Sequence, residues 1–393
     1  MKKYVCLTLL CICLSVHTYG QIGIVINPNP ILTTAEHLSL FSEASLIARG
    51  GVGVTYSPAL GLTHFAQNPA LLGNGQEGWN IQASGATWLR ELVDRDPIFL
   101  GEFHAARTWK RGGMSISGSS FHFSFRPPRS NLNPSSFFIQ RVGGMLGHNL
   151  RFSGGFSLSP KFSVGAGINS FSQVVFNNTT FEEFRFYSFS GDLGLHYQDQ
   201  VQIKERITAQ FGAGLSLTHV GPKMNFDREG LGFSESRYIP ATGRLGGQVT
   251  IAFEDAASTA SWGIMMALQT SKLMVPSASA DQDVDPYLAV FTSVADNPLG
   301  WRFELREFGW NGGVSIFRKL PSGFYFALHS GLNSRTRYQG GVRQFSLGAE
   351  WGTDRVQVRY AYLFRSQYIY FQREWGMKNI RRGDHFLTLG IRI

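Results

Sequence analysis

Carboxylates and histidines are the residues of this sequence with the clearest potential for metal chemistry. Asp281, Asp283 and Asp285 alternate along the chain, and carboxylate oxygens at such spacing are typical of calcium-binding loops. The central glycine and the closing glutamate of an EF-hand are missing, however, so a solvated loop is the favoured interpretation. The ten histidines are scattered, and no pair has the HExxH spacing of a zinc site. We therefore predict no metal ligands.

Nucleophile and cofactor motifs give equally little support for catalysis. The chain contains no GxSxG sequence, so the nucleophile of an α/β-hydrolase is not expected. Residues 73–78 match the GxGxxG pattern of dinucleotide-binding loops, but they precede a predicted strand instead of opening a helix. We predict no catalytic residue and no cofactor, and expect a protein that is not an enzyme.

The first twenty residues predict export. Lys2 and Lys3 precede an apolar stretch, and small residues near position 20 predict cleavage of a signal peptide spanning 1–20. A retained anchor is the alternative, but the apolar run is short for a membrane span. All three cysteines lie in this segment, so the mature chain is expected to have no disulfides. Losing Lys2 and Lys3 lowers the net charge from +9 to +7. In an exported chain this excess suits anionic outer-membrane lipid, and no nucleic-acid partner is expected.

The mature chain is dominated by alternating apolar and polar residues. Only 16% of the residues are charged, 13% are aromatic and 45 are glycine, a composition that excludes intrinsic disorder. Residues 355–362 and 207–218 alternate with a period of two, as β-strands do when their two faces differ in polarity. The polar face is rich in glycine and serine, which suits a narrow or filled interior. After residue 20 the sequence contains no stretch of about 18 apolar residues, so no membrane-spanning helix is predicted.

Fourteen strands are predicted between residues 79 and 393. They cover 79–88, 100–109, 113–125, 148–158, 161–175, 185–198, 205–218, 241–254, 260–270, 308–318, 323–334, 343–352, 355–365 and 384–393. Short and long connections alternate strictly, as periplasmic turns and extracellular loops do in outer-membrane barrels. A soluble sandwich would also alternate in polarity but has no reason to sort its loops in this way. The expected fold is all-β, a 14-stranded antiparallel transmembrane β-barrel.

Residues 21–78 do not continue this pattern. Residues 34–48 predict a short helix, and the glycine-rich residues 50–54 and the Asn68-Pro69-Ala70 turn follow. Inside a barrel lined by glycine and serine, such a segment is expected to be an N-terminal hatch or plug that enters from the periplasmic end. A free N-terminal tail is the alternative.

An ordered series of segments resembles the PorV-type outer-membrane proteins of the type IX secretion system, relatives of the FadL-like barrels. The matching segments are 50–54, 68–70, 88–93, 221–226, 238–240, 244–246, 271–276, 303–311 and 386–393. They cover most of the mature chain. Residues 65–67, where an aromatic residue beside Asn68 would be expected, and the basic residues of 366–383 depart from the pattern, which leaves a paralogue with another cargo or task open.

The resemblance implies a non-enzymatic carrier in the bacterial outer membrane. Proteins of this type bind the C-terminal signal domain of secreted cargo at a giant translocon barrel of the SprA kind, and deliver it to a cell-surface attachment complex with a PorU-type sortase. Two alternatives remain: FadL-like uptake of small hydrophobic molecules, and a surface enzyme acting on an envelope lipid. A continuous apolar cavity through the lumen would favour uptake, and a lumen packed shut would favour the carrier.

The partner-binding surface is predicted on two long loops, 219–240 and 271–307. They flank the predicted strands 241–254 and 260–270, so they should lie close together. Their candidate contact residues combine basic and apolar side chains, the usual composition of an interface hot spot: Lys223, Arg228, Arg237, Met274, Val275, Leu288, Phe291 and Trp301. In the alternative interpretation, the apolar residues fold inward and cap the lumen.

Overall fold

A computed structural model describes most of the chain. The described residues are 38, 41–55, 65–88, 98–124, 144–177, 182–228, 233–254, 260–276, 284–297, 300–334, 343–365 and 383–393. The predicted signal peptide lies outside them, as do Asp281 and Asp283 and much of residues 126–147 and 366–383.

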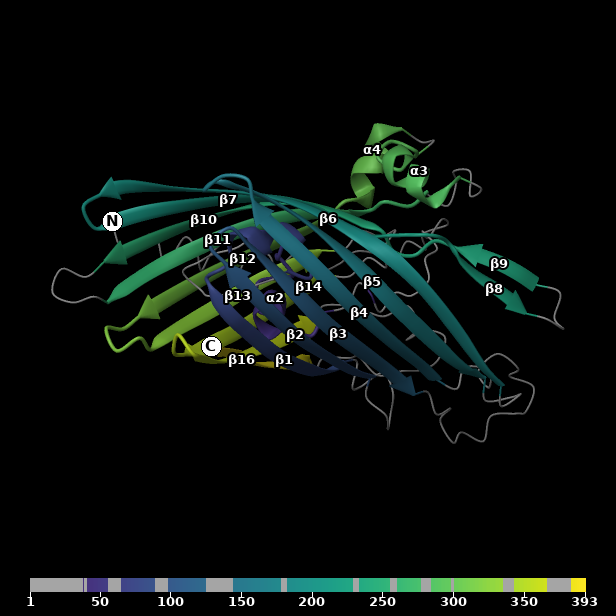
Figure 1. The fold of residues 1–393 in the computed structure, drawn as a ribbon, viewed down its shortest axis with the longest axis horizontal. Coiled ribbons are helices and arrows are strands. Elements are labelled where there is room, and N and C mark those ends of the chain that lie inside the picture. Colours follow the sequence, from purple (N-terminus) through teal and green to yellow (C-terminus); the bar gives the residue numbers. More distant parts are fainter. Residues whose placement is uncertain are drawn as a thin grey trace.

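Fourteen antiparallel strands close into a barrel (Figure 1). The order around the barrel is β1-β16-β15-β14-β13-β12-β11-β10-β7-β6-β5-β4-β3-β2. The first seven are β1 (Gly78–Trp88), β2 (Ile98–Trp109), β3 (Gly112–Ser124), β4 (Gly144–Ser157), β5 (Phe162–Asn177), β6 (Glu182–Lys204) and β7 (Ile207–Val220). The others are β10 (Thr242–Glu254), β11 (Ser261–Leu273), β12 (Gly309–Lys319), β13 (Tyr325–Ser334), β14 (Arg343–Gly352), β15 (Val356–Arg365) and β16 (Asp384–Arg392). The predicted fold class is confirmed, and β6 is the strand that most exceeds its predicted length.

The alternation of the sequence separates the two faces of the wall. In β7, Gly214, Ser216 and Thr218 point into the barrel and are buried, whereas Phe211 and Leu215 point outward and are exposed. Because every backbone group of a closed barrel is paired and its outer surface is apolar, the wall suits the hydrocarbon interior of a membrane. The barrel is therefore an outer-membrane architecture.

The last strand closes the barrel on the first. Ile81 pairs with Ile391, and Thr87 pairs with His385. The backbone N–H of Trp79 donates to the carbonyl of Ile393 at 2.8 Å, and the reciprocal bond is 3.0 Å. The sheet is closed at this junction, because β1 and β16 pair continuously from Asn80–Arg392 to Thr87–His385.

Helices and a hairpin occupy places where the sequence predicted only loops. The loop 219–240 holds the hairpin β8 (Met224–Arg228) and β9 (Phe233–Arg237), and the loop 271–307 holds α3 (Pro286–Thr292), α4 (Trp301–Glu304) and the 3-10 helix η6 (Leu305–Glu307). On the N-terminal side, α2 covers Ala44–Ala48 in the described part of the predicted helix 34–48, and η4 spans Pro69–Asn74. No helix in the described part of the chain is long and apolar enough to cross a membrane.

The described N-terminal segment lies inside the barrel. Figure 1 shows α2 within the ring of strands, where it contacts β13, β14, β15 and β16, while η4 contacts β3, β4, β5 and β6. The hairpin β8–β9 and the helices α3 and α4 lie at the opposite end from the short turns (Figure 1). The end with the long connections is expected to face the cell surface.

Cysteine labelling of whole cells tests this orientation. A cysteine at Val294, which is exposed on the long-loop side, should react with a membrane-impermeant maleimide. One at Thr353, in a short turn, should react only after the outer membrane is permeabilised. Labelling in the reverse order would invert the orientation.

Candidate partner-binding site

Glycines on the inner wall let the backbone of the N-terminal segment pack directly against the strands, and we call these positions the glycine seats. A Cβ atom at Gly331 would overlap the backbone of Gly50, and one at Gly214 would overlap the carbonyl of Val54. A Cβ at Gly313 would come within 2.7 Å of the carbonyl of Arg49. Backbone packed against backbone at these places leaves no space between the wall and the segment. We call the described residues 41–55 and 65–77 the hatch.

Hydrogen bonds from the wall then hold the hatch in one position. The side chain of Gln269 in β11 accepts from the N–H groups of Gly53 and Val54, at 3.1 and 3.0 Å. Asn68 donates to the carbonyls of Val54 and Leu195, at 2.8 and 3.0 Å. The hatch therefore satisfies its buried backbone through the wall, as a permanent part of the fold would.

A buried ion network joins the hatch to strands β13, β14 and β15. Arg359 lies 2.8 Å from Glu350 and 3.6 Å from Glu43 at the start of α2, and His329 lies 3.4 Å from Glu350. All four side chains are nearly inaccessible to solvent, so removing the charge of Arg359 or Glu350 would leave its partner unpaired in a low-dielectric interior. On the other side of the lumen, Arg151 pairs with Asp192 at 3.0 Å and donates to the carbonyl of Ala66.

A small cavity lies between the hatch and strands β1 and β2. Its volume is about 30 Å³, which is room for a single water, and Glu43, Gln82, Glu102 and His104 are among its lining residues. At the level of the described hatch, the lumen is occupied by protein.

The helices α3, α4 and η6 form a compact unit on the long-loop side. Ala289 and Val290 of α3 pack on Tyr238, Ala241 and Val275, which come from the two predicted partner loops and their junctions with β10 and β11. The hydroxyl of Tyr238 donates to the carbonyl of Val284 at 2.7 Å. The two loops therefore meet, as the sequence predicted. We call the described residues 284–297 and 300–307 the platform.

Lys272 anchors the platform to the barrel. It lies at the end of β11, is only 3% exposed, and pairs with Glu304 and, at 3.0 Å, with Glu307. Its ammonium also donates to the carbonyl of Ser293. Asn297 joins the same group through Glu304 and Glu307. One buried cation thus ties both helical parts of the platform to the wall.

The platform presents an apolar face to its surroundings. Leu288 and Phe291 lie three residues apart in α3 and therefore on one side of the helix, and Phe291 is 75% exposed. Trp301 in α4 is 69% exposed, and Leu305, four residues later, is also exposed. Tyr287 and Val294 extend the face of α3. Exposed apolar side chains of this size in one small unit mark an interaction surface.

The predicted contact residues divide into two groups. Leu288, Phe291 and Trp301 lie on the exposed face, whereas Val275 is buried in the core of the platform and Met274 is half-buried. The prediction of an exposed contact is therefore wrong for Val275, which folds inward because the platform needs an apolar core. The structure leaves the binding role itself a prediction.

The basic residues of the prediction lie beside this core. The Lys223 ammonium sits 4.5 Å from the centre of the Tyr238 ring, which ties it to the base of the platform. Arg237 is partly exposed at the end of β9, and the side chain of Arg228 in β8 lies outside the described residues.

Acidic residues of the platform have structural roles. Asp285 is the N-cap of α3, and its side chain accepts from the N–H groups of Tyr287 and Leu288. Asp296, Glu304 and Glu307 bring three carboxylates together, and the Lys272 ammonium already neutralises part of their charge. The sequence analysis missed Lys272, because nothing in a strand pattern indicates that an outer position will be covered by a helix.

Replacing Lys272 by methionine should loosen the platform without opening the barrel. The Lys272→Met variant leaves Glu304 and Glu307 buried without their cation, which costs about 3 to 5 kcal/mol. Hydrogen exchange of the α3 amides should become much faster. Lys319→Met is the matched control, because its pair with Asp354 is exposed and such pairs contribute about 0 to 1 kcal/mol. Equal exchange in the two variants would disprove the anchor.

Comparison with known proteins yields a similarity of fold. No family model matches the sequence, and no curated protein matches it. Among solved structures, the chain is similar to the Ralstonia pickettii toluene transporter TbuX, with a TM-score of 0.44 and 12% identity over 88% of this chain and 97% of that chain. The Pseudomonas putida toluene transporter TodX gives 0.46 and 9%, over 88% and 97%. A Pseudomonas aeruginosa FadL homologue gives 0.42 and 11%, over 92% and 98%. The likeness concerns the barrel fold alone.

Proposed function

We propose that this barrel is a non-enzymatic carrier that binds protein partners at its cell-surface rim. The apolar face of the platform binds these partners, with Leu288, Phe291 and Trp301 as the central contacts. The barrel wall and the filled lumen hold this face at the membrane surface.

The exposure of Phe291 and Trp301 on an anchored unit is the observation that carries the proposal. Two aromatic side chains that are 75% and 69% exposed cost free energy in water and gain it on contact with a partner. The buried Lys272 cluster fixes the platform before binding, so less conformational entropy is lost when a partner docks.

The identity of the partner follows from the sequence resemblance. PorV-type proteins of the type IX secretion system bind C-terminal signal domains of secreted cargo, a giant SprA-type translocon barrel and a PorU-type attachment complex. These are the proposed partners of the platform. The filled lumen is compatible with this role, since a carrier that grips folded domains at its rim need conduct nothing.

Uptake of small hydrophobic molecules is the second candidate. The barrels of similar fold are described as a toluene transporter and a monoaromatic hydrocarbon channel. For this chain to act in the same way, the hatch would have to leave its glycine seats or rearrange to open a path. The two candidates therefore differ in whether the hatch moves.

Complementation of a deletion strain separates these functions. Cells without the chain receive either the natural sequence or the Phe291→Asp/Trp301→Asp variant. On the carrier proposal, secreted proteins accumulate in the periplasm with the variant, and uptake of toluene is unchanged. Normal secretion with the variant, together with toluene uptake that is lost in cells without the chain, would favour the second candidate.

A further inference from the structure

The small cavity beside the hatch has a polar lining that comes from both the hatch and the wall. Its volume is about 30 Å³. The wall contributes two cross-strand pairs of β1 and β2, and the hatch contributes two further polar side chains: Gln82 with His104, Ser84 with Glu102, and Glu43 and Gln67. We call this cavity the hatch cavity. A ligand bound in it would contact the hatch and the wall together.

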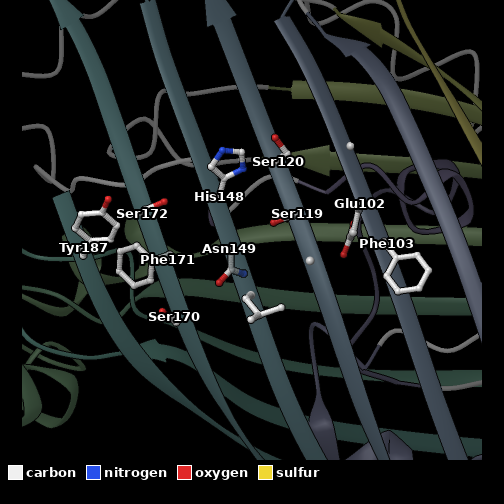
Figure 2. Close-up of a pocket in the computed structure, with 13 residues that line it drawn as sticks. Glu102, Phe103, Ser119, Ser120, His148, Asn149, Ser170, Phe171, Ser172 and Tyr187 are labelled. Atoms are coloured by element: carbon white, nitrogen blue, oxygen red, sulfur yellow. The ribbon is translucent and has the colours of Figure 1, made fainter. Parts of the chain in front are cut away.

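Glu102 points from β2 into the lumen. Its neighbour Phe103 is exposed on the outer face, and successive side chains of a strand point to opposite faces. Figure 2 shows the two residues as neighbours on one strand, with their side chains apart. His104, which follows Phe103, is buried on the inner face. The carboxylate of Glu102 therefore faces the hatch.

This carboxylate has no cationic partner among the residues that the structure describes. The Ser42 hydroxyl donates to its Oε2 atom at 3.3 Å, and the same hydroxyl lies 2.6 Å from that of Ser84. A single long hydrogen bond from a hydroxyl does not offset the cost of a negative charge in a low-dielectric interior. Glu102 therefore needs a positive charge close by.

The nearby arginines are used by other carboxylates. Arg359 lies 2.8 Å from Glu350, and Arg151 lies 3.0 Å from Asp192. Each of these pairs balances its own charge. One negative charge, that of Glu102, is left over at the hatch cavity.

Gln67 provides a second and independent indication of a ligand. Its side chain is 1% exposed and lines the hatch cavity, and its amide nitrogen donates to the carbonyl of Gly51. The oxygen of the same amide accepts no hydrogen bond within the described part of the chain. Buried acceptors of this kind are almost always paired with a donor or a cation. The hatch therefore supplies an oxygen ligand from the side opposite Glu102.

The size and charge of the site select the ligand. A volume of about 30 Å³ holds one water or one bare ion and excludes an organic cation. Ca²⁺ takes about six to eight oxygen ligands and Mg²⁺ keeps several waters, and the hatch cavity has no room to complete such a shell. A single positive charge is also sufficient to balance Glu102.

We propose that the hatch cavity binds a monovalent metal cation such as sodium. Its oxygen ligands are the carboxylate of Glu102, the amide oxygen of Gln67 and the hydroxyl of Ser84. Since Gln67 belongs to the hatch and the other two belong to the wall, the ion holds the hatch in place. This role is independent of the platform and of the carrier function.

Hydrogen exchange in two salts tests the proposal. The purified barrel is kept in detergent at neutral pH, in sodium chloride or in choline chloride at the same ionic strength. The amides of Ala44, Ser45 and Leu46 report on the hatch, because they bond to the wall at Thr388 and to Glu43. Sodium at about ten times its dissociation constant should slow their exchange roughly ten-fold relative to choline.

Three variants assign this effect to the hatch cavity. The Glu102→Gln variant keeps the shape of the side chain but removes its charge, so its exchange should be the same in both salts. The Ser84→Ala variant loses one ligand and should need more sodium for the same protection. The Glu254→Gln variant, altered at the exposed end of β10, should respond to sodium as the natural sequence does. Heat-modifiable gel mobility shows that each barrel is folded.

Thallium(I), a monovalent ion with strong anomalous scattering, locates the site in crystals of the natural protein. We expect one anomalous peak between Glu102 and Gln67. Equal exchange of the natural sequence in the two salts would overturn the proposal. Density in the hatch cavity without an anomalous signal would show a water instead, and protection that changes with pH but not with sodium would show a proton on Glu102. Either result would also overturn it.

Discussion

Aspartate at positions 291 and 301 should abolish partner binding while leaving the barrel intact. In the Phe291→Asp/Trp301→Asp variant, two exposed aromatic side chains are replaced by charges that cannot enter an apolar partner surface. Central aromatic contacts contribute about 2 kcal/mol or more each, so the pair should weaken binding by roughly a thousand-fold. Pull-down of partners from solubilised outer membranes, followed by quantitative mass spectrometry, measures the loss.

The matched control places the same charge on the same helix. Thr292 is exposed in α3 but contributes no large apolar surface, so the Thr292→Asp variant should retain its partners. The folding of the platform is checked by hydrogen exchange, because Ala289 and Val290 are untouched in every variant. Full retention of partners by the Phe291→Asp/Trp301→Asp variant would place the partner surface elsewhere on the barrel.

One methyl group at Gly331 should unseat the hatch. The Gly331→Ala variant places a Cβ atom on the backbone of Gly50, which has no room to move because Gly313 and Gly348 hold the residues beside it. Arg49 is 2% exposed and should become a trypsin site once the hatch leaves the wall. We expect rapid cleavage after Arg49 in the variant and none in the natural protein under the same conditions.

A glycine on the outer face supplies the comparison. At Gly154 in β4 the nearest atom to an added Cβ is a carbonyl oxygen 3.9 Å away, which is ordinary contact. Both substitutions put alanine in place of glycine in a strand, so any difference reflects the hatch and not the strand. If Arg49 stays protected in the Gly331→Ala variant, the hatch is not held by the glycine seats.

The barrel could be predicted from the sequence because the two faces of each strand have different surroundings, so apolar and polar residues alternate along it. Residues 355–362 alternate because one face meets lipid and the other meets the lumen, and β15 confirms both faces. The strict alternation of short and long connections then distinguished a membrane barrel from a soluble sandwich. Most predicted strand bounds agree with the structure to within a few residues, because the alternation ends where a turn begins, and β6 is the main exception.

The site was less accessible to this reasoning, because its parts depend on contacts between distant segments. Lys272 continues the outer face of β11, and only the fold of residues 284–307 buries it. Similarly, Gly331 and Gly214 are ordinary strand residues until the hatch packs on them. The short pieces β8, β9 and α3 carry too few residues for a period to be visible. Val275 was predicted as a contact residue, because the sequence alone does not show that the fold of the platform buries it.

Affinity purification from the native outer membrane tests the central proposal most directly. The natural protein and the Phe291→Asp/Trp301→Asp variant are isolated from cells that lack the chromosomal copy, and their partners are compared by mass spectrometry. The carrier account predicts that a giant barrel or proteins with C-terminal β-sandwich domains accompany the natural protein and are missing from the variant. A natural protein that carries no protein partner, together with toluene uptake that depends on the chain, would contradict it.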